Sequence, residues 1–201
     1  IGGSSAGARP KIMTQLNNKN EILHGSQKLI EGFEHYIIKF PNSNDGLNIG
    51  KIEYIYSLMA RKANIEIPET RLLKGKKNSY FAIKRFDRIK DNRLHIHSVA
   101  GLTHSDFRIP SLDYDDLLTL CFHLTKDITE VKKLFRLAVF NLFTHNRDDH
   151  AKNFSFMLDE KNSWKLTPAY DLTFSYGVGT AHSTTYLNEG KNPNINHLEK
   201  L

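Results

Sequence analysis

Several features are scarce or missing from this sequence. It has one cysteine, Cys121, so no disulfide can form within the chain, and a single thiol is typical of a reducing compartment such as the cytoplasm. No run of about 18 apolar residues occurs, which argues against a membrane span. The first residues are rich in glycine and serine rather than apolar, so no signal peptide is predicted. Repeats and low-complexity tracts are also lacking.

What remains is the composition of a soluble globular protein. The chain has 201 residues, of which 39% are apolar and 25% charged, enough to bury a core in one domain or in one domain with two lobes. It starts at Ile1 instead of Met and stops inside a stretch, "NINHLEKL", that is typical of a new helix. We therefore expect part of a longer protein, or a short form of one.

The positive charge is local. The net charge is +6, but residues 61–93 contain 11 Lys or Arg against 4 Asp or Glu, so the rest of the chain is close to neutral. Such a patch suits DNA, tRNA or a nucleotide phosphate, although a solvated basic hairpin is the commoner explanation. The sequence contains no zinc-finger spacing and no aromatic RNA-binding signature that would favour nucleic-acid binding.

The first half of the chain predicts a small antiparallel sheet with one helix. Strands are expected over residues 10–16, 21–24, 34–41 and, on either side of a turn at 75–78, twice within 69–86. Between them the period changes from 2 to 3.6, and one helical stripe over 48–64 consists of Ile52, Ile55, Tyr56, Met59 and Ala63. A charged loop follows at 87–95.

The second half predicts a mainly helical unit. Two helices, 113–127 and 129–145, each open with acidic and capping residues, and the second is apolar nearly all round from Leu134 to Phe143, as in a buried central helix. A short hairpin follows over 153–168. The fold class is therefore α+β with two lobes, which we place at 1–87 and 88–201, with the seam near residues 86–94.

The segment "HNRDDHAKN", residues 145–153, concentrates polar chemistry between the apolar helix and the hairpin. Asp148 and Asn153 are five positions apart, and Asp171 follows the hairpin. One free carboxylate and two oxygen ligands are the minimum for magnesium-assisted phosphoryl transfer. Asp148 would accept the proton of an attacking hydroxyl, and Asn153 and Asp171 would hold magnesium.

The first half supplies matching elements. A loop rich in glycine and serine at residues 1–9 precedes Lys39, which is placed to meet nucleotide phosphates, and Glu53 on the predicted helix is a candidate partner for Lys39. The segment "AIKRFD", residues 82–87, would be the hinge whose backbone meets adenine. Each of these elements alone also has an ordinary structural explanation. The kinase hypothesis depends on all of them occurring in this order along the chain.

Two other functions stay open. "HNRDDH" with Asp171 would suit the His/Asp metal centre of a phosphohydrolase, although no further histidine motif converges on it. A basic module that binds nucleic acid within a repressor complex would explain the charge but would leave the Asp, Asn and Asp set without a role.

Six segments, taken together, resemble the HipA family of serine/threonine-kinase toxins from bacterial toxin–antitoxin modules. They are "SSAGARPK", "YIIKFP", "KRFDR", "HIHS", "NRDDHAKNFSF" and "TPAYDLT", and they span residues 4–173. The resemblance implies a two-lobed protein-kinase-like fold. A short or split version of the family, of the HipT type, is one form that fits the length. It also implies a growth-arresting kinase that uses ATP and Mg²⁺.

The resemblance also implies roles for individual residues. Asp148 would be the catalytic base, Asn153 and Asp171 the magnesium ligands, and Lys39 a contact to the ATP phosphates. The adenine and ribose would meet three residues of the hinge, namely Lys84, Phe86 and Asp87. Supporting roles fall to Glu53, His150 and Lys152.

Regulation and partners follow from the same resemblance. Ser4, or else Ser5, would be autophosphorylated, and the added charge of about −1.5 to −2 would repel the ATP phosphates. The implied substrate is an aminoacyl-tRNA synthetase, and the implied partner is a HipB-like antitoxin with a helix-turn-helix domain that contacts operator DNA. The chain departs from longer members because nothing precedes the glycine-rich loop and only 30 residues follow Asp171, so a separate HipS-like protein is one way to replace the missing N-terminal piece.

Overall fold

The structure is a computed structural model that describes residues 9–25, 28–42, 46, 48–76, 78–104 and 112–201. The chain divides into two compact units. The first comprises Ile1–Met59 and Pro68–Arg93, and the second comprises Ala60–Ile67 and Leu94–Leu201. The predicted lobe boundary between residues 87 and 88 stays a prediction.

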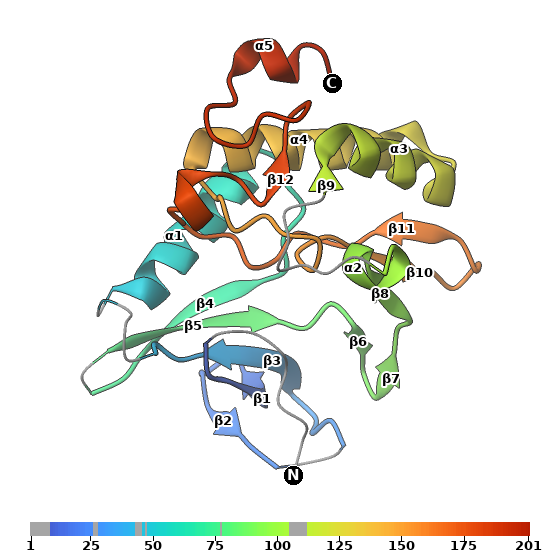
Figure 1. Cartoon of the computed structure of the whole chain (residues 1–201). Coiled ribbons are helices and arrows are strands. Elements are labelled where there is room, and N and C mark those ends of the chain that lie inside the picture. Colours follow the sequence, from blue (N-terminus) through green and yellow to red (C-terminus); the bar gives the residue numbers. More distant parts are fainter. Residues whose placement is uncertain (1–8, 26–27, 43–45, 47, 77, 105–111) are drawn as a thin grey trace. The chain divides into compact units, whose positions relative to one another are not determined.

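A five-stranded antiparallel sheet forms the body of the first unit (Figure 1). Its strand order is β2-β1-β3-β5-β4, so two hairpins, β1–β2 and β4–β5, are joined through the central strand β3. The bounds are β1 Lys11–Asn17, β2 Ile22–Leu23, β3 Phe33–Lys39, β4 Thr70–Lys74 and β5 Ser79–Lys84. The expected strands are therefore present, with β2 reduced to two residues.

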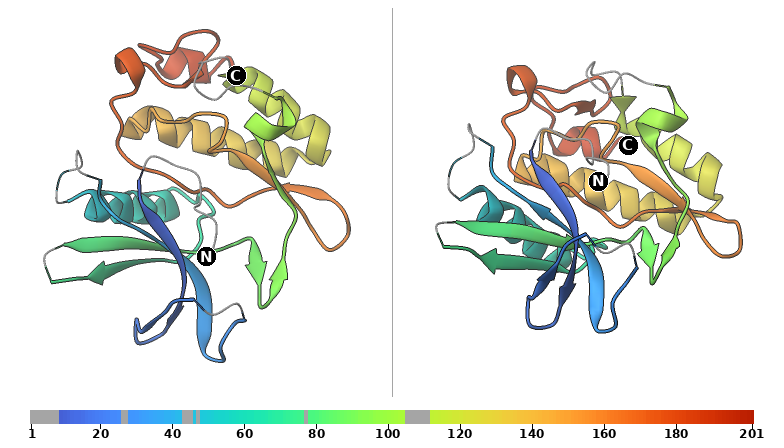
Figure 2. Two further views of the ribbon diagram at one scale, coloured as in Figure 1. Left: turned by 60° about the horizontal axis from the view of Figure 1, so that its bottom comes forward. Right: turned by 90° about the horizontal axis from the view of Figure 1, so that it is seen from below.

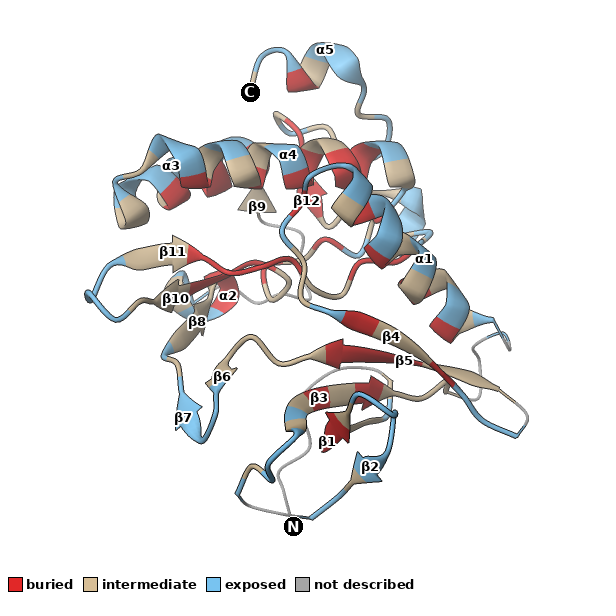
Figure 3. Cartoon of the chain, turned by 180° about the vertical axis from the view of Figure 1, so that it is seen from behind, coloured by how far each residue is buried: buried red, intermediate tan, exposed pale blue. Residues whose placement is uncertain are grey.

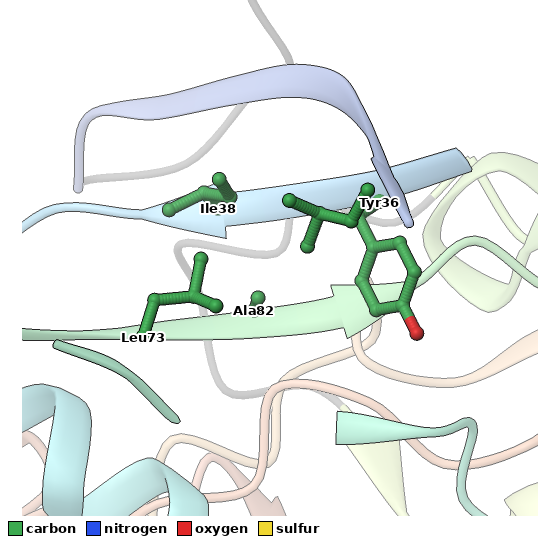
Figure 4. Close-up of a cluster of buried hydrophobic side chains, with 5 residues drawn as sticks. Tyr36, Ile38, Leu73 and Ala82 are labelled. Carbon is green, nitrogen blue, oxygen red and sulfur yellow. The ribbon is translucent and has the colours of Figure 1, made fainter. Parts of the chain in front are cut away.

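One face of this sheet carries a compact apolar cluster. Tyr36 and Ile38, two apart on β3, point to the same side as Ala82 of β5 and Leu73 of β4 (Figure 4). The register pairs Ile38 with Ala82 directly, and the small alanine leaves room for the larger neighbours. Tyr36 is completely buried, and this burial raises the pKa of its hydroxyl far above the usual value.

Helix α1, Ile49–Lys62, covers the opposite face of the sheet. Its Ser57 hydroxyl bonds the Thr70 hydroxyl of β4 at 2.8 Å, and Gly50 lies so close to β5 that a Cβ there would meet the Ser79 carbonyl oxygen at 2.5 Å. The small and polar side of the helix is therefore the buried one.

This burial contradicts the apolar stripe expected from the sequence. Ile55 is 52% exposed and Met59 is 41% exposed, whereas Glu53 is only 2% exposed. Figure 3 shows α1 with much of its surface in the exposed colour. The hydrophobic period failed here because an ion pair, described below, makes burial of Glu53 favourable.

The charged segment after β5 is also more ordered than the loop expected for residues 87–95. Strands β6, Arg88–Ile89, and β7, Asn92–Arg93, form a two-stranded hairpin, with Lys90 in the left-handed region at φ 54°. Strands of only two residues carry no alternation that can be detected in the sequence.

Two antiparallel helices dominate the second unit. Helix α3, Tyr114–Thr125, is capped by Asp113, and helix α4, Ile128–Thr144, is capped by Asp127. Each capping carboxylate accepts a hydrogen bond from the second residue of its helix, as the acidic sequence starts predicted. The helices lie side by side in both views of Figure 2.

Helix α4 is buried on one side and not all round. Leu134 and Ala138 are fully buried, but Phe143 near the C-terminal end is 60% exposed. The expectation of a fully enclosed central helix is therefore wrong at that end. Cys121 of α3 is fully buried, as predicted for a core thiol.

Short strands complete the second unit, and their buried residues are visible in Figure 3. A three-stranded sheet has the order β11-β10-β8, and a parallel pair joins β12 to β9. The bounds are β8 Ile96–Ser98, β9 Leu112–Asp113, β10 Ser155–Leu158, β11 Trp164–Leu166 and β12 Thr184–Thr185. The remaining helices are α2 Val99–Leu102, the 3₁₀ turn Val178–Thr180 and α5 Ile195–Leu198. Among the described residues, no helix is long and apolar enough to traverse a lipid bilayer.

The close approach of α1 to β5 gives a stability prediction. Gly50→Ala places a methyl group 2.5 Å from a backbone oxygen, and we expect a loss of about 1–3 kcal/mol in urea unfolding, despite the better helix propensity of alanine. Gly46→Ala is the matched control because a Cβ there meets nothing within 4 Å. Equal stability of the two variants would show that the packing of α1 on β5 is looser than described.

Candidate active site

The loop after α4 begins with a sharp, rigid turn. His145 caps the helix in the left-handed conformation at φ 54°, and the backbone then carries Asn146 into the interior, where it is 2% exposed. The Asn146 amide donates to the Asn141 side chain of α4 at 2.9 Å. The loop therefore starts from a fixed point on a buried helix.

Asp149 is the anchor of this loop. Its carboxylate is 1% exposed and accepts hydrogen bonds from the Tyr114 hydroxyl at 2.9 Å and from the backbone N–H groups of Ser183 at 2.8 Å and Thr184 at 3.2 Å. His182 Nδ1 lies 2.9 Å from the same carboxylate. A buried carboxylate is stable only with such partners, and here they come from two distant segments.

The neighbour of this anchor, Asp148, faces outward. Its side chain is 58% exposed, and His150 Nε2 lies 3.8 Å from Oδ1. Burial of Asp149 and exposure of Asp148 therefore place two adjacent carboxylates in opposite environments. A carboxylate placed in this way is accessible to a substrate.

Asn153 closes the loop over the same residue. Its Nδ2 donates to the backbone carbonyl of Asp148 at 2.7 Å, so its Oδ1 faces away from that bond. A backbone bond from Asn153 N to His150 O at 2.8 Å tightens the turn. The five-residue spacing thus brings the two side chains onto one short loop.

Asp171 follows Tyr170, whose side chain is hydrogen-bonded to this loop. The Tyr170 hydroxyl donates to the carbonyl of Lys152 at 2.7 Å and bonds the Ser155 hydroxyl at 2.6 Å. Burial raises the pKa of Tyr170 to about 12, so the phenol keeps its proton near neutral pH. Asp171 follows in the left-handed region at φ 59°, a conformation that asparagine and aspartate tolerate.

The first unit carries a second buried carboxylate beside a predicted site residue. Lys39 Nζ lies 3.1 Å from Glu53 Oε2, and Arg9 Nη1 donates to Glu53 Oε1 at 3.0 Å. The ammonium also lies 5.6 Å from the centre of the Phe81 ring. The ion pair suggested by the sequence is therefore present, and the Lys39 side chain is 11% exposed.

A backbone hydrogen bond and two arginine–aspartate ion pairs hold the predicted hinge, residues 82–87. Lys84 N donates to Glu69 O at 2.8 Å, and Asp87 accepts from Arg85 Nε at 2.8 Å and from Arg88. Burial acts to raise the pKa of Asp87, but the hydrogen bonds and charge of Arg85 outweigh it, so the pKa lies below the usual value. The proposed contacts of Lys84, Phe86 and Asp87 with ATP stay predictions. Ser4 and Ser5 lie outside the described residues.

The second unit offers oxygen ligands that suit Mg²⁺. Asn153 could contribute an amide oxygen turned away from its own hydrogen bond, and Asp171, next to the Tyr170 that bonds this loop, could contribute a carboxylate. Within the described ranges, no group of three or more His, Cys, Asp or Glu side chains is arranged to hold a metal ion. The structure therefore gives no support for the His/Asp centre of a phosphohydrolase.

Comparison with known proteins assigns the family. The HipA-like C-terminal domain matches residues 3–201, almost the whole chain. The chain belongs to this HipA-like family.

Sequence relatives carry kinase names. A Sinorhizobium fredii protein called "Putative kinase Y4dM" is 25% identical over 82% of this chain and 43% of its own length, and a Haemophilus influenzae protein called "Putative kinase" is 24% identical over 85% and 52%. The chain thus spans about half the length of the curated relatives it matches.

Solved structures confirm the predicted fold. Shewanella oneidensis HipA, solved with HipB and its operator DNA, aligns with a TM-score of 0.68 at 19% identity over 92% of this chain and 48% of that one. The Helicobacter pylori proinflammatory kinase CtkA aligns with a TM-score of 0.54 at 20% identity over 77% and 55%. The HipA-like, kinase-like fold and the family resemblance expected from the sequence are both confirmed.

Sequence reasoning missed the residues that hold this HipA-like site together. The sequence analysis assigns no role to Asp149 beside Asp148, nor to its partner His182, which is 3% exposed. Arg9 was not recognised as a partner of Glu53. The doubled aspartate was a usable signal, because one loop rarely exposes two adjacent carboxylates to the same side.

The two aspartates should differ sharply in their effect on stability. Asp149→Ala leaves a buried hydroxyl, an imidazole and two N–H groups without their acceptor, so we expect a loss of about 3 kcal/mol or more in urea unfolding. Asp148→Ala, at an exposed position, should change stability by about 0.5 kcal/mol or less. Similar losses in both variants would contradict the division of labour between them.

Proposed function

We propose that this chain is the catalytic core of an ATP- and magnesium-dependent protein serine/threonine kinase that acts as the toxin of a toxin–antitoxin module. The observation that carries the proposal is the outward-facing Asp148, fixed between buried Asp149 and the amide of Asn153. A single accessible carboxylate with two oxygen ligands close in the chain is the arrangement that phosphoryl transfer needs.

Asp148 would act as the base. It accepts the proton from a serine or threonine hydroxyl while that oxygen forms a bond to the γ-phosphorus, and the bond from this phosphorus to the ADP oxygen breaks. His150, at 3.8 Å, limits the rotation of the Asp148 carboxylate. Lys152 supports the loop through its carbonyl, which Tyr170 holds.

Asn153 and Asp171 would hold Mg²⁺, which neutralises charge on the phosphate oxygens. Lys39 would contact the phosphates of ATP. Its ion pair with Glu53 holds the ammonium group in one position. The backbone of Lys84 and Phe86 would meet adenine, with Asp87 near the ribose. The low pKa of Asp87 supports an acceptor role, since the group stays ionised.

The finer assignments rest on the family. We propose a cytoplasmic kinase with an aminoacyl-tRNA synthetase as its substrate, and autophosphorylation of Ser4 or Ser5 as its switch. The S. oneidensis HipA structure contains HipB and operator DNA, which supports a HipB-like helix-turn-helix antitoxin as the partner here, with DNA reached through the complex. A HipS-like protein is proposed as a second partner from the family resemblance.

A nucleic-acid-binding module remains the rival function. Several cations of the basic stretch are already neutralised, because Arg85 and Arg88 pair with Asp87 and Lys84 pairs with Glu34. This local pairing weakens the case for a polyanion surface in the first unit.

Phosphoryl transfer from γ-labelled ATP with Mg²⁺ tests the proposal. Asp148→Asn should reduce label on the protein itself and on proteins of a bacterial extract by about 10²-fold or more, because the base is lost. Asp116→Asn is the matched control, an exposed aspartate on α3 with the same charge change. Equal transfer by wild type and Asp148→Asn, or none by folded wild type, would contradict the kinase assignment.

A further inference from the structure

A cavity of about 450 Å³ opens in the second unit at the C-terminal end of α4. Four of its lining side chains are basic or can become so, namely His145, Arg147, His182 and Lys191, and no aspartate or glutamate lines it. Exposed apolar side chains, Phe143 at 60% and Ile195 at 54%, form another part of its wall. We call this cavity the basic pocket.

Arg147 and Lys191 of the basic pocket form no ion pair with the residues that the structure describes, whereas His182 pairs with the buried Asp149 carboxylate at 2.9 Å. Among the described residues, the Arg147 side chain makes one long hydrogen bond, from Nη1 to the Tyr176 carbonyl at 3.4 Å, and its Nε is buried without a hydrogen-bond partner. No ion pair involves Lys191 among the described residues. The nearest acid in sequence, Glu189, directs its carboxylate to the backbone N–H groups of Lys191 and Asn192 at 2.7 and 2.9 Å. An unsatisfied guanidinium nitrogen beside a cavity is a position that an anion would stabilise.

The walls of the pocket are held firmly in place. His182 donates its backbone N–H to Gly190 O at 2.8 Å, and its ring contacts Asp149 on the opposite side. Gly177, at φ 70°, lets the segment after Asp171 pass close to Arg147, since a Cβ there would clash with the Ala181 carbonyl oxygen and lie 3.0 Å from the Arg147 Cβ. The cations are thus presented by a rigid frame, which lowers the entropy lost on binding.

We infer that the basic pocket binds an anionic side chain, phosphorylated or carboxylate, of a peptide segment that also carries an apolar residue. Arginine and lysine together recognise phosphate and carboxylate through charge-assisted hydrogen bonds. The exposed aliphatic Ile195 beside Phe143 favours a peptide, because one apolar peptide side chain can cover both residues, whereas nucleic-acid bases stack on aromatic side chains such as Phe143. A second copy of this chain is disfavoured by its net charge of +6.

The site would lie one side chain from the catalytic loop. His182 lines the pocket and contacts Asp149, the residue that follows the proposed base. Binding itself needs neither ATP nor transfer, so the inference goes beyond the proposed function and can be tested when that function fails.

Three fluorescent peptides of one sequence test the inference, with phosphoserine, glutamate or serine beside a leucine, titrated by anisotropy without ATP. We expect saturable binding of the phosphoserine peptide, weaker binding of the serine peptide by about tenfold or more, and a similar loss in the Lys191→Glu variant. Affinity for the glutamate peptide shows whether carboxylate can replace phosphate.

Lys132→Glu is the matched control, an exposed lysine on α4 outside the pocket with the same charge reversal, and it should change affinity less than about twofold. Equal weakening by the two variants would overturn the inference, since general charge would then explain binding. No saturable binding of either anionic peptide would overturn it as well. So would tighter binding of a single-stranded oligonucleotide that Lys191→Glu abolishes.

Discussion

The loop that carries the proposed base depends on one buried carboxylate. Asp149 accepts hydrogen bonds from Tyr114 of α3 and from the backbone of Ser183 and Thr184, and it contacts His182. These bonds connect the helical core, the loop after α4 and the segment that follows Asp171. Asp149 is buried and its neighbour Asp148 is exposed, so one carboxylate anchors the loop and the other stays accessible.

The first unit also contains a buried carboxylate, which here holds two basic side chains in position. Glu53 is buried and ion-paired, and its partners Lys39 and Arg9 are held in position by it. In both units a buried acid fixes the residue to which the kinase hypothesis assigns chemistry. Since a buried charge without partners costs several kcal/mol, loss of the partners of Asp149 or of Glu53 would be strongly unfavourable. Each reactive side chain is thereby kept in one place.

Much of the architecture follows from local patterns. Asp113 and Asp127 mark the starts of α3 and α4, the expected strands of the first sheet are present, and the HipA-like fold is confirmed. The site residues Asp148, Asn153 and Asp171 were identified from spacing and resemblance, and their catalytic roles remain predictions. The rest depends on distant contacts. Burial of Asp149 requires partners about 35 positions away, and the buried side of α1 was mistaken because Glu53 pairs across the sheet.

The most direct test of the central claim is an experimental structure of the protein with Mg²⁺ and a non-hydrolysable ATP analogue. The account predicts metal density bonded to the Asn153 amide oxygen and the Asp171 carboxylate, with the γ-phosphate facing Asp148. Metal or nucleotide bound elsewhere on the chain at saturating concentrations, with this loop unchanged and empty, would contradict it.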